Sequence, residues 1–120
     1  ALDTLERAHA QYPRKGRTVV MLAYFLATSP AMELRDGARA LDLARRAYEA
    51  TGSLQHGALI AMALAELGRC NEAAERQRQL VEAAERAGNK DLLARLSADL
   101  KRYEGAQSCR PVGPTTLNEP

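Results

Sequence analysis

The sequence lacks the residues that usually build strands and bulky cores. It has no tryptophan, only 4% aromatic residues and few β-branched residues among its 120 positions. Ala, Leu, Arg and Glu, which favour helix formation, dominate instead. Small alanine side chains also let helices approach each other closely. The composition therefore predicts an all-α protein with a thin core of tightly packed helices.

A strong charge of one sign and a long apolar run are also missing. Lys and Arg number 17 against 15 Asp and Glu, so the net charge is only +2. That balance does not indicate a nucleic-acid partner, and the basic cluster Arg14, Lys15 and Arg17 is interpreted as a solvated loop. No apolar run approaches the ~20 residues that cross a bilayer, so we expect no direct membrane insertion. The first residue is Ala1 rather than methionine, which leaves an upstream segment open.

No arrangement of residues typical of catalysis or metal binding is visible. His9 and His56 are the only histidines, and the two cysteines show no C-x2-C spacing. A zinc site, in contrast, needs about four converging ligands. The carboxylates fall mainly on polar helix faces with arginines three or four positions away, as in Asp42 with Arg46, which is typical of solvated surface pairs. We therefore predict no enzymatic activity, no cofactor and no metal site.

The spacing of apolar residues predicts six helices. They cover about residues 1–11, 18–27, 37–51, 54–67, 71–87 and 89–104, and residues 31–36 form a linker. Gly52 and Gly88 are expected to end helices, and Ser53 to cap the start of the fourth. The connections are short, apart from the one around Pro30, and short connections make neighbouring helices antiparallel. The pattern predicts a stack of helical hairpins.

Two pairs of helices repeat the same pattern of small and large residues. In the third and fifth helices, Ala40-x3-Ala44-x2-Ala47 corresponds to Ala73-x3-Gln77-x2-Leu80. In the second and fourth, Leu22-Ala23-x2-Leu26 corresponds to Ile60-Ala61-x2-Leu64. The two correspondences are offset by 33 and 38 positions, and an insertion at residues 29–33 accounts for the longer offset. The chain therefore contains an internal repeat.

This repeat resembles the tetratricopeptide repeat (TPR) family, whose two-helix unit has about 34 residues and a large–small pair in its first helix. The resemblance implies a short right-handed α-solenoid over residues 1–105, made of a half repeat 1–13, repeats 17–52 and 54–87, and a capping helix 89–104. Residues 106–120 would form a tail, largely disordered after about residue 111.

The match to the family is incomplete in two ways. Gly57 and Gln77 stand where the family usually has large rings, so a generic antiparallel α-hairpin protein is the alternative. The first helix resembles the second helix of a repeat, with Pro13 ending it, and a half repeat cannot bury its own face. We expect an upstream partner helix or self-association through this N-terminal face. Residues 26–37 look like a variant found in bacterial repeat proteins.

The resemblance also implies a binding face, because the first helix of each repeat lines the concave side. Counting helical turns predicts that this face consists of Arg17, Val20, Tyr24, Ala27, Gln55, Ala58 and Met62. Such an apolar groove suits an amphipathic helix or an extended peptide. The alternative is that Val20, Tyr24 and Met62 pack against an upstream helix or each other.

The predicted function is a non-enzymatic scaffold for protein–protein interaction, the terminal part of a longer TPR array. Its partner is a protein or peptide that the sequence does not identify. The alternative is a regulatory or assembly appendage of an enzyme or membrane protein encoded upstream.

The two cysteines are within reach of each other in this arrangement. Cys70 begins the fifth helix, and the antiparallel sixth helix returns Tyr103 to the same level, a few residues before Cys109. A disulfide closing a loop of about 40 residues would contribute on the order of 4 kcal/mol. It would favour a periplasmic or extracellular location, whereas two free thiols would favour the cytoplasm.

Overall fold

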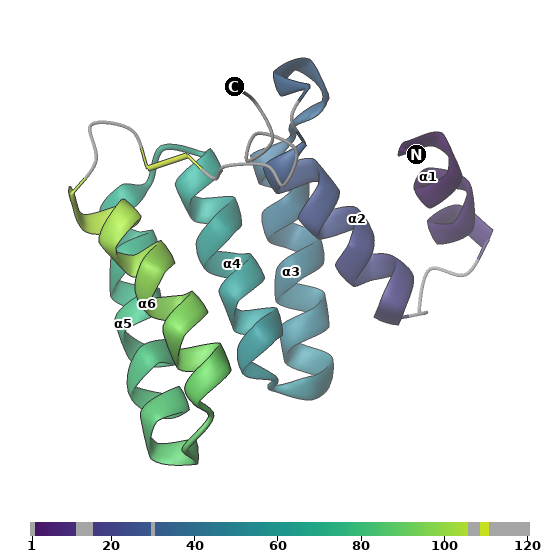
Figure 1. Ribbon diagram of the computed structural model, residues 1–120. Coiled ribbons are helices and arrows are strands. Elements are labelled where there is room, and N and C mark those ends of the chain that lie inside the picture. Colours follow the sequence, from purple (N-terminus) through teal and green to yellow (C-terminus); the bar gives the residue numbers. More distant parts are fainter. Residues whose placement is uncertain (1, 12–15, 30, 106–108, 111–120) are drawn as a thin grey trace.

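The structure is a computed structural model that describes residues 2–11, 16–29, 31–105 and 109–110 (Figure 1). Within these residues the chain forms six α-helices and no strand. The helices are α1 (Leu2–Gln11), α2 (Gly16–Thr28), α3 (Gly37–Thr51), α4 (Leu54–Glu66), α5 (Cys70–Ala87) and α6 (Lys90–Gly105). A short 3-10 turn, η1 (Met32–Leu34), lies between α2 and α3. The prediction of an all-α fold with six helices is confirmed.

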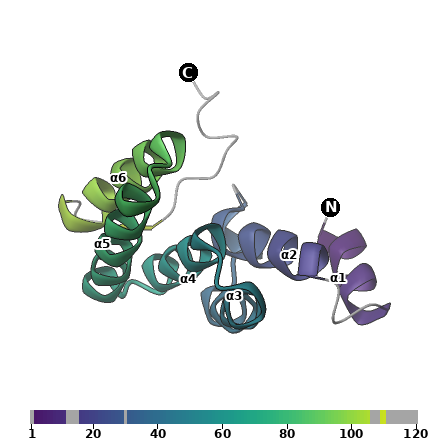
Figure 2. The same cartoon turned by 90° about the horizontal axis from the view of Figure 1, so that it is seen from below.

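The helices form a stack in chain order. Each helix packs against the next one along the chain, and α2 also packs against α4. Figure 2 shows the helices in a row, from α1 at one end to α5 and α6 at the other. This arrangement is consistent with a helical repeat. The handedness of the solenoid and the repeat boundaries stay predictions, and most of the predicted tail, 106–120, lies outside the described residues.

The helix ends follow from local residues that the sequence already marks. Gly52 and Gly88 follow α3 and α5 with φ of +66° and +71°, in the left-handed region that strains other residues. Ser53 Oγ accepts a hydrogen bond from the backbone N–H of His56 at 3.1 Å, which caps the start of α4. At the other boundaries the structure differs by a few residues, since α2 begins at Gly16 and α5 at Cys70.

The segment between α2 and α3, expected to be a linker, is held by an arginine. The Arg35 guanidinium donates from Nε to the Ser29 carbonyl oxygen at 2.7 Å and from Nη1 to Glu66 Oε1 at 2.8 Å. Only 4% of the Arg35 side chain and 6% of the Glu66 side chain are exposed. A buried ion pair therefore fixes this connection, including η1, to the end of α4.

The core is built mainly from leucine and alanine, as the composition suggests. The main cluster runs through α2, α3, α4 and the start of α5, where Leu22, Ala44, Ala61 and Ala73 are all fully buried. A second, smaller cluster joins α5 to α6 and contains Leu80, Ala84, Leu92 and Leu96. The small alanines allow α3, α4 and α5 to lie close together.

Helix α1 packs against α2 and is also joined to the core and to α3. Leu5 packs against the main core cluster. The Glu6 carboxylate accepts two hydrogen bonds of 2.5 Å from the Arg39 guanidinium at the start of α3. These hydrogen bonds hold the pKa of Glu6 below its ordinary value. The predicted half repeat thus contacts both α2 and α3.

Gly57 has a packing role that explains the missing ring at this position. A Cβ atom at Gly57 would lie 2.8 Å from Leu80 Cδ2 and 3.4 Å from Tyr48 Cε1, so α4 needs the absence of a side chain here. Leu80 and Tyr48 fill the space from the neighbouring helices.

We predict that Gly57→Leu lowers the free energy of unfolding by about 2 kcal/mol, because inserting carbons into a packed site strains its neighbours. Urea denaturation would measure the loss. Gly105→Leu serves as the control, since nothing lies within 4 Å of a Cβ atom there. In a Leu80→Ala background, which removes the closest atom, Gly57→Leu should cost less. An equal cost in both backgrounds would contradict the steric explanation.

Candidate functional site

The helical stack carries an open groove with a volume of about 920 Å³. Residues from α1, α2, α4 and α6 line it, and most of them are apolar. They are Thr4, Leu5, Val20, Met21, Tyr24, Phe25, Gln55, His56, Ala58, Leu59, Met62, Leu92, Arg95, Leu96 and Asp99. We call this surface the α2–α4–α6 groove. Its volume lies in the range typical of ligand-binding clefts.

The apolar side chains of the groove differ in how far they are exposed. Val20 and Met62 are half-buried against the main core and form part of its floor. Met21 and Tyr24, both on α2, are exposed, and 48% of Met21 is accessible to solvent. Large apolar side chains that remain exposed and gathered in a groove are typical of interaction sites.

Few charged groups line the groove, and most of them already have partners. Asp99 forms an ion pair of 3.1 Å with Arg102. His56 Nδ1 lies 2.7 Å from the hydroxyl of Thr51. For Arg95, on α6, the described part of the chain provides no ion-pair partner. The groove therefore offers one positive charge beside an apolar surface.

The structure brings together five of the seven residues predicted for the binding face. Val20, Tyr24, Gln55, Ala58 and Met62 all line the α2–α4–α6 groove. Their involvement in binding stays a prediction.

The other two residues do not line the groove. Arg17 is exposed near the start of α2 and is not among the lining residues. Ala27 is buried in the main core, because it lies on the same side of α2 as Ala23, another core residue. Counting helical turns placed Ala27 on the groove side of α2, whereas the structure places it in the core.

Sequence reasoning did not assign α6 to the groove. That helix was interpreted as a capping helix, although Leu92, Arg95, Leu96 and Asp99 recur at three- and four-residue spacing and share one side. Thr4 and Leu5 of α1 were missed as well. The spacing within α6 could have indicated a lining face, but only the packing of α6 on α5 shows which surface that face joins.

The titratable groups do not converge in the groove. Among the described residues, no group of three or more His, Cys, Asp or Glu side chains could hold a metal ion. Burial, together with the nearby Asp99 charge, raises the pKa of Tyr103 well above its ordinary value. Tyr103 belongs to the main core cluster, which also contains Cys109, and does not line the groove.

No described helix has the length and apolar character needed to cross a membrane.

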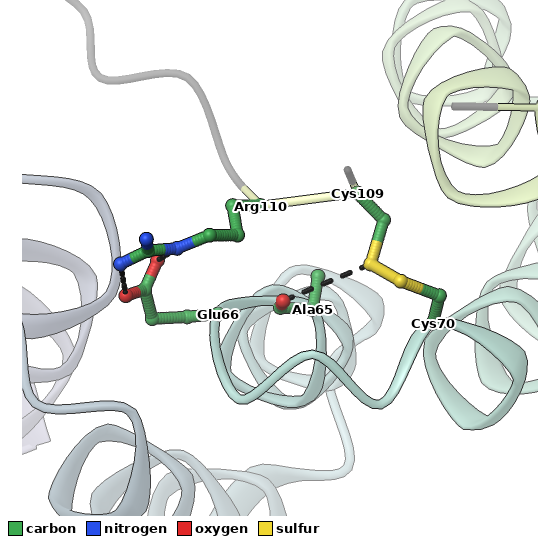
Figure 3. The surroundings of a disulfide bond; sticks show 5 residues. All are labelled: Ala65, Glu66, Cys70, Cys109 and Arg110. Atoms are coloured by element: carbon green, nitrogen blue, oxygen red, sulfur yellow. Dashed lines mark hydrogen bonds and ion pairs between the residues drawn. A yellow bond between two sulfur atoms is a disulfide. The ribbon is translucent and has the colours of Figure 1, made fainter. Parts of the chain in front are cut away.

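A second feature lies at the end of α4, where the two cysteines meet (Figure 3). Cys70 and Cys109 are placed at disulfide-bonding distance, with their Cα atoms 5.9 Å apart and 39 positions between them in sequence. Cys109 is only 1% exposed, and its sulfur lies 3.7 Å from the carbonyl oxygen of Ala65. This is the cysteine pairing that the helix lengths made reachable.

Glu66 sits beside this cysteine pair and receives two guanidinium groups. Arg35 reaches it from the α2–α3 connection at 2.8 Å, and Arg110 reaches both its carboxylate oxygens from the C-terminal side (Figure 3). Burial would raise the pKa of Glu66, but the hydrogen bonds from Arg110 and Arg35 outweigh burial and hold that pKa below its ordinary value. The carboxylate therefore stays charged at neutral pH.

Comparison with known proteins does not assign the chain to a family. No family model, no curated protein and no solved structure matches it.

Proposed function

We propose that this chain is a non-enzymatic interaction module whose α2–α4–α6 groove binds an amphipathic helix of another protein. The observation that carries the proposal is the groove itself, with the exposed Met21 and Tyr24 above a half-buried apolar floor. Amphipathic helices dock into such grooves through residues at i, i+3, i+4 and i+7.

The charge of the groove adds a requirement on the partner. Arg95 lines the groove without an ion-pair partner in the described residues, while Asp99 is already engaged by Arg102. A helix that places a carboxylate beside its apolar stripe would complement this arginine. Charge complementarity of this kind directs the orientation and choice of a partner more than it raises affinity.

We further infer that the stack is a TPR-like array and part of a longer scaffold. The internal repeat and the chain-order packing of its helices support this inference. The cysteine pair at bonding distance supports an oxidising compartment, such as the periplasm or the cell exterior. Intact mass of the chain isolated without reductant tests the last point, since alkylation of both cysteines would contradict it.

The groove proposal is tested with a displayed library of 20-residue helical segments selected against the immobilised chain. We expect selected segments to carry an apolar stripe with one adjacent acidic residue. Met21→Gln should weaken their binding about tenfold, as expected for a central apolar contact. Met32→Gln is the matched control because Met32 is equally exposed, at 46%, but lies in η1 outside the groove. Fluorescence anisotropy gives both dissociation constants.

A charge exchange checks the role of Arg95 separately. Arg95→Glu should weaken binding of the helix that carries the acidic residue. Binding to this variant should be restored when the acidic residue of the helix is changed to lysine. Equal effects of the Met21 and Met32 variants, or enrichment of extended proline-rich segments, would count against the proposal. The proposal would also be contradicted if the chain sediments as a dimer and the Met21→Gln variant as a monomer, because a second copy of this chain would then occupy the groove.

A further inference from the structure

The cysteine pair holds the last two described residues across the end of α4. The sulfur of Cys109 joins this segment to Cys70 at the start of α5, and the guanidinium of Arg110 joins it to Glu66 (Figure 3). We call Cys109 and Arg110 the latch segment. Its two attachments lie on two different helices, so it bridges α4 and α5.

The helical stack has contacts of its own that do not pass through the latch segment. Helix α6 packs on α5 through the second core cluster, and Gln77 Nε2 donates to the Leu96 carbonyl oxygen at 3.0 Å. Arg78 on α5 also pairs with Glu104 near the end of α6 at 2.9 Å. These contacts keep α6 in place whether or not the cysteines are joined.

The charges at the end of α4 also remain balanced without the latch segment. Glu66 keeps its buried partner Arg35, while the Arg110 side chain is already 44% exposed and can move into water. Release of the segment therefore leaves no buried charge unpaired. In contrast, Arg110 is 44% exposed although Glu66 is buried, so this ion pair holds the segment less firmly than a covalent bond between the two sulfurs.

We propose that Cys70 and Cys109 form a redox-controlled latch: oxidation fastens the latch segment across the end of α4, and reduction frees it while the helical stack stays folded. The pair thus regulates the position of the latch segment, and the helical stack folds without it.

The redox step requires a dithiol reductant. Its thiolate attacks the sulfur of Cys70, which is half-buried, whereas Cys109 is almost fully buried. The Cys70–Cys109 bond breaks, and Cys109 leaves as a thiolate that takes up a proton. The second thiol of the reductant then attacks the mixed disulfide and releases Cys70. Two electrons and two protons pass to the protein, and the reductant becomes a cyclic disulfide.

Arg110 acts as a positioning residue in the reverse step, in which a disulfide oxidant such as oxidised glutathione accepts two electrons and two protons from Cys70 and Cys109. Its contact with both oxygens of Glu66 brings the neighbouring Cys109 over the end of α4, next to Cys70. Even a transient ion pair raises the fraction of reduced molecules in which the two sulfurs can meet. Arg110 should therefore speed the formation of the bond without being needed once the bond exists.

The first experiment uses the full 15N-labelled chain before and after dithiothreitol. Reduction should lower the heteronuclear NOE of the Cys109 and Arg110 amides from helix-like values to those of a mobile chain, and reoxidation should restore them. The dispersed amide signals of α4, α5 and α6 should stay those of the folded stack, although exchange through global unfolding accelerates because the closed loop is lost. The Cys70→Ser/Cys109→Ser variant should match the reduced protein in the absence of reductant.

Two results would overturn the latch. Unchanged NOE values on reduction would mean that the segment stays docked without the bond. Loss of the dispersed amide signals of α4, α5 and α6 on reduction would mean that the stack does not fold without the bond.

The second experiment measures disulfide formation in a glutathione redox buffer. Arg110→Gln should slow it about threefold, within the range of an exposed ion pair, and Arg110→Lys should restore part of the rate. Lys101→Gln, an exposed basic residue of α6, is the control for net charge. Equal rates for Arg110→Gln and Lys101→Gln would remove Arg110 from the mechanism.

Discussion

Glu66→Gln is expected to lower the free energy of unfolding by about 3 kcal/mol at pH 7, because it leaves a buried arginine without its counter-charge. The Arg35 side chain is 4% exposed, and Glu66 supplies its only carboxylate among the described residues. A glutamine amide is nearly the same shape, but its NH2 group must face one of the two guanidinium groups. If that group faces Arg35, the guanidinium keeps only the backbone oxygens of Ser29 and Thr28 as acceptors. If it faces Arg110, Arg35 keeps a neutral oxygen in place of a carboxylate.

Substituting the arginine should cost less than substituting the glutamate. In Arg35→Gln, Glu66 still pairs with Arg110 at the surface of the end of α4. Urea denaturation of both variants would test this order. Glu72→Gln is the matched control: Glu72 also pairs with an arginine, Arg69, but both side chains are largely exposed, so little change is expected. A loss in Glu66→Gln no larger than in the control would contradict the role given to the buried pair.

The same pair makes stability depend on pH in the acid range. The pKa of Glu66 is lower in the folded chain than its ordinary value of 4.5, so its stabilisation is complete above that pH. It is lost as the pH falls through the lower folded pKa. The difference in stability between the natural chain and Glu66→Gln should therefore shrink below about pH 4.5. A difference that stays constant from pH 7 to pH 3 would mean that the charge of Glu66 is not what stabilises the fold.

The parts of the structure that could be predicted depend on local residue patterns. Gly52, Ser53 and Gly88 mark helix ends through backbone conformation and side-chain capping, which act within a few residues. The reach of Cys109 to Cys70 follows from helix lengths alone, since two antiparallel helices of similar length return the chain to its starting level. The positions of Tyr24 and Met62 in the groove follow from the helical period, because residues three or four positions apart lie on the same side of a helix.

The parts that could not be predicted depend on where helices meet. Arg35 and Glu66 are 31 positions apart, and each looks like an ordinary surface charge on its own helix or connection. The part that α6 plays in lining the groove depends on how that helix packs on α5, which no pattern within α6 encodes. Gln77 and Gly57 were noted only as departures from the expected rings. Their packing explains them, since Leu80 fills the space over Gly57 and Gln77 bonds to α6.

Gln77→Glu is expected to cost about 3–4 kcal/mol at pH 7, although it changes only one NH2 group to oxygen. Gln77 is 0% exposed, and its Nε2 donates to the Leu96 carbonyl oxygen at 3.0 Å. Its Oε1 has no partner among the described residues. A carboxylate at this position would be buried, would lack a donor and would face the carbonyl oxygen of Leu96.

The variant can escape this cost only by binding a proton. A protonated glutamic acid could donate to Leu96 and restore the hydrogen bond, and protonating a carboxyl group of ordinary pKa about 4.3 at pH 7 costs about 3.7 kcal/mol. Burial raises the pKa in the folded state, so the deficit should be nearly absent below that ordinary value and grow by about 1.4 kcal/mol per pH unit above it. The deficit of Glu66→Gln also grows with rising pH, but it levels off above about pH 4.5, whereas the deficit of Gln77→Glu keeps growing there.

Denaturation of Gln77→Glu at pH 5, 6 and 7 would measure the slope. Gln79→Glu is the matched control, because it makes the same change on the same helix at an exposed position and should show no such slope. Gln77→Met, which removes the unpaired Oε1 together with the donor and keeps the volume, should cost little. A Gln77→Glu deficit that does not change with pH would mean that water or a charged group reaches this position in solution, and that α5 and α6 pack less tightly there than the structure shows.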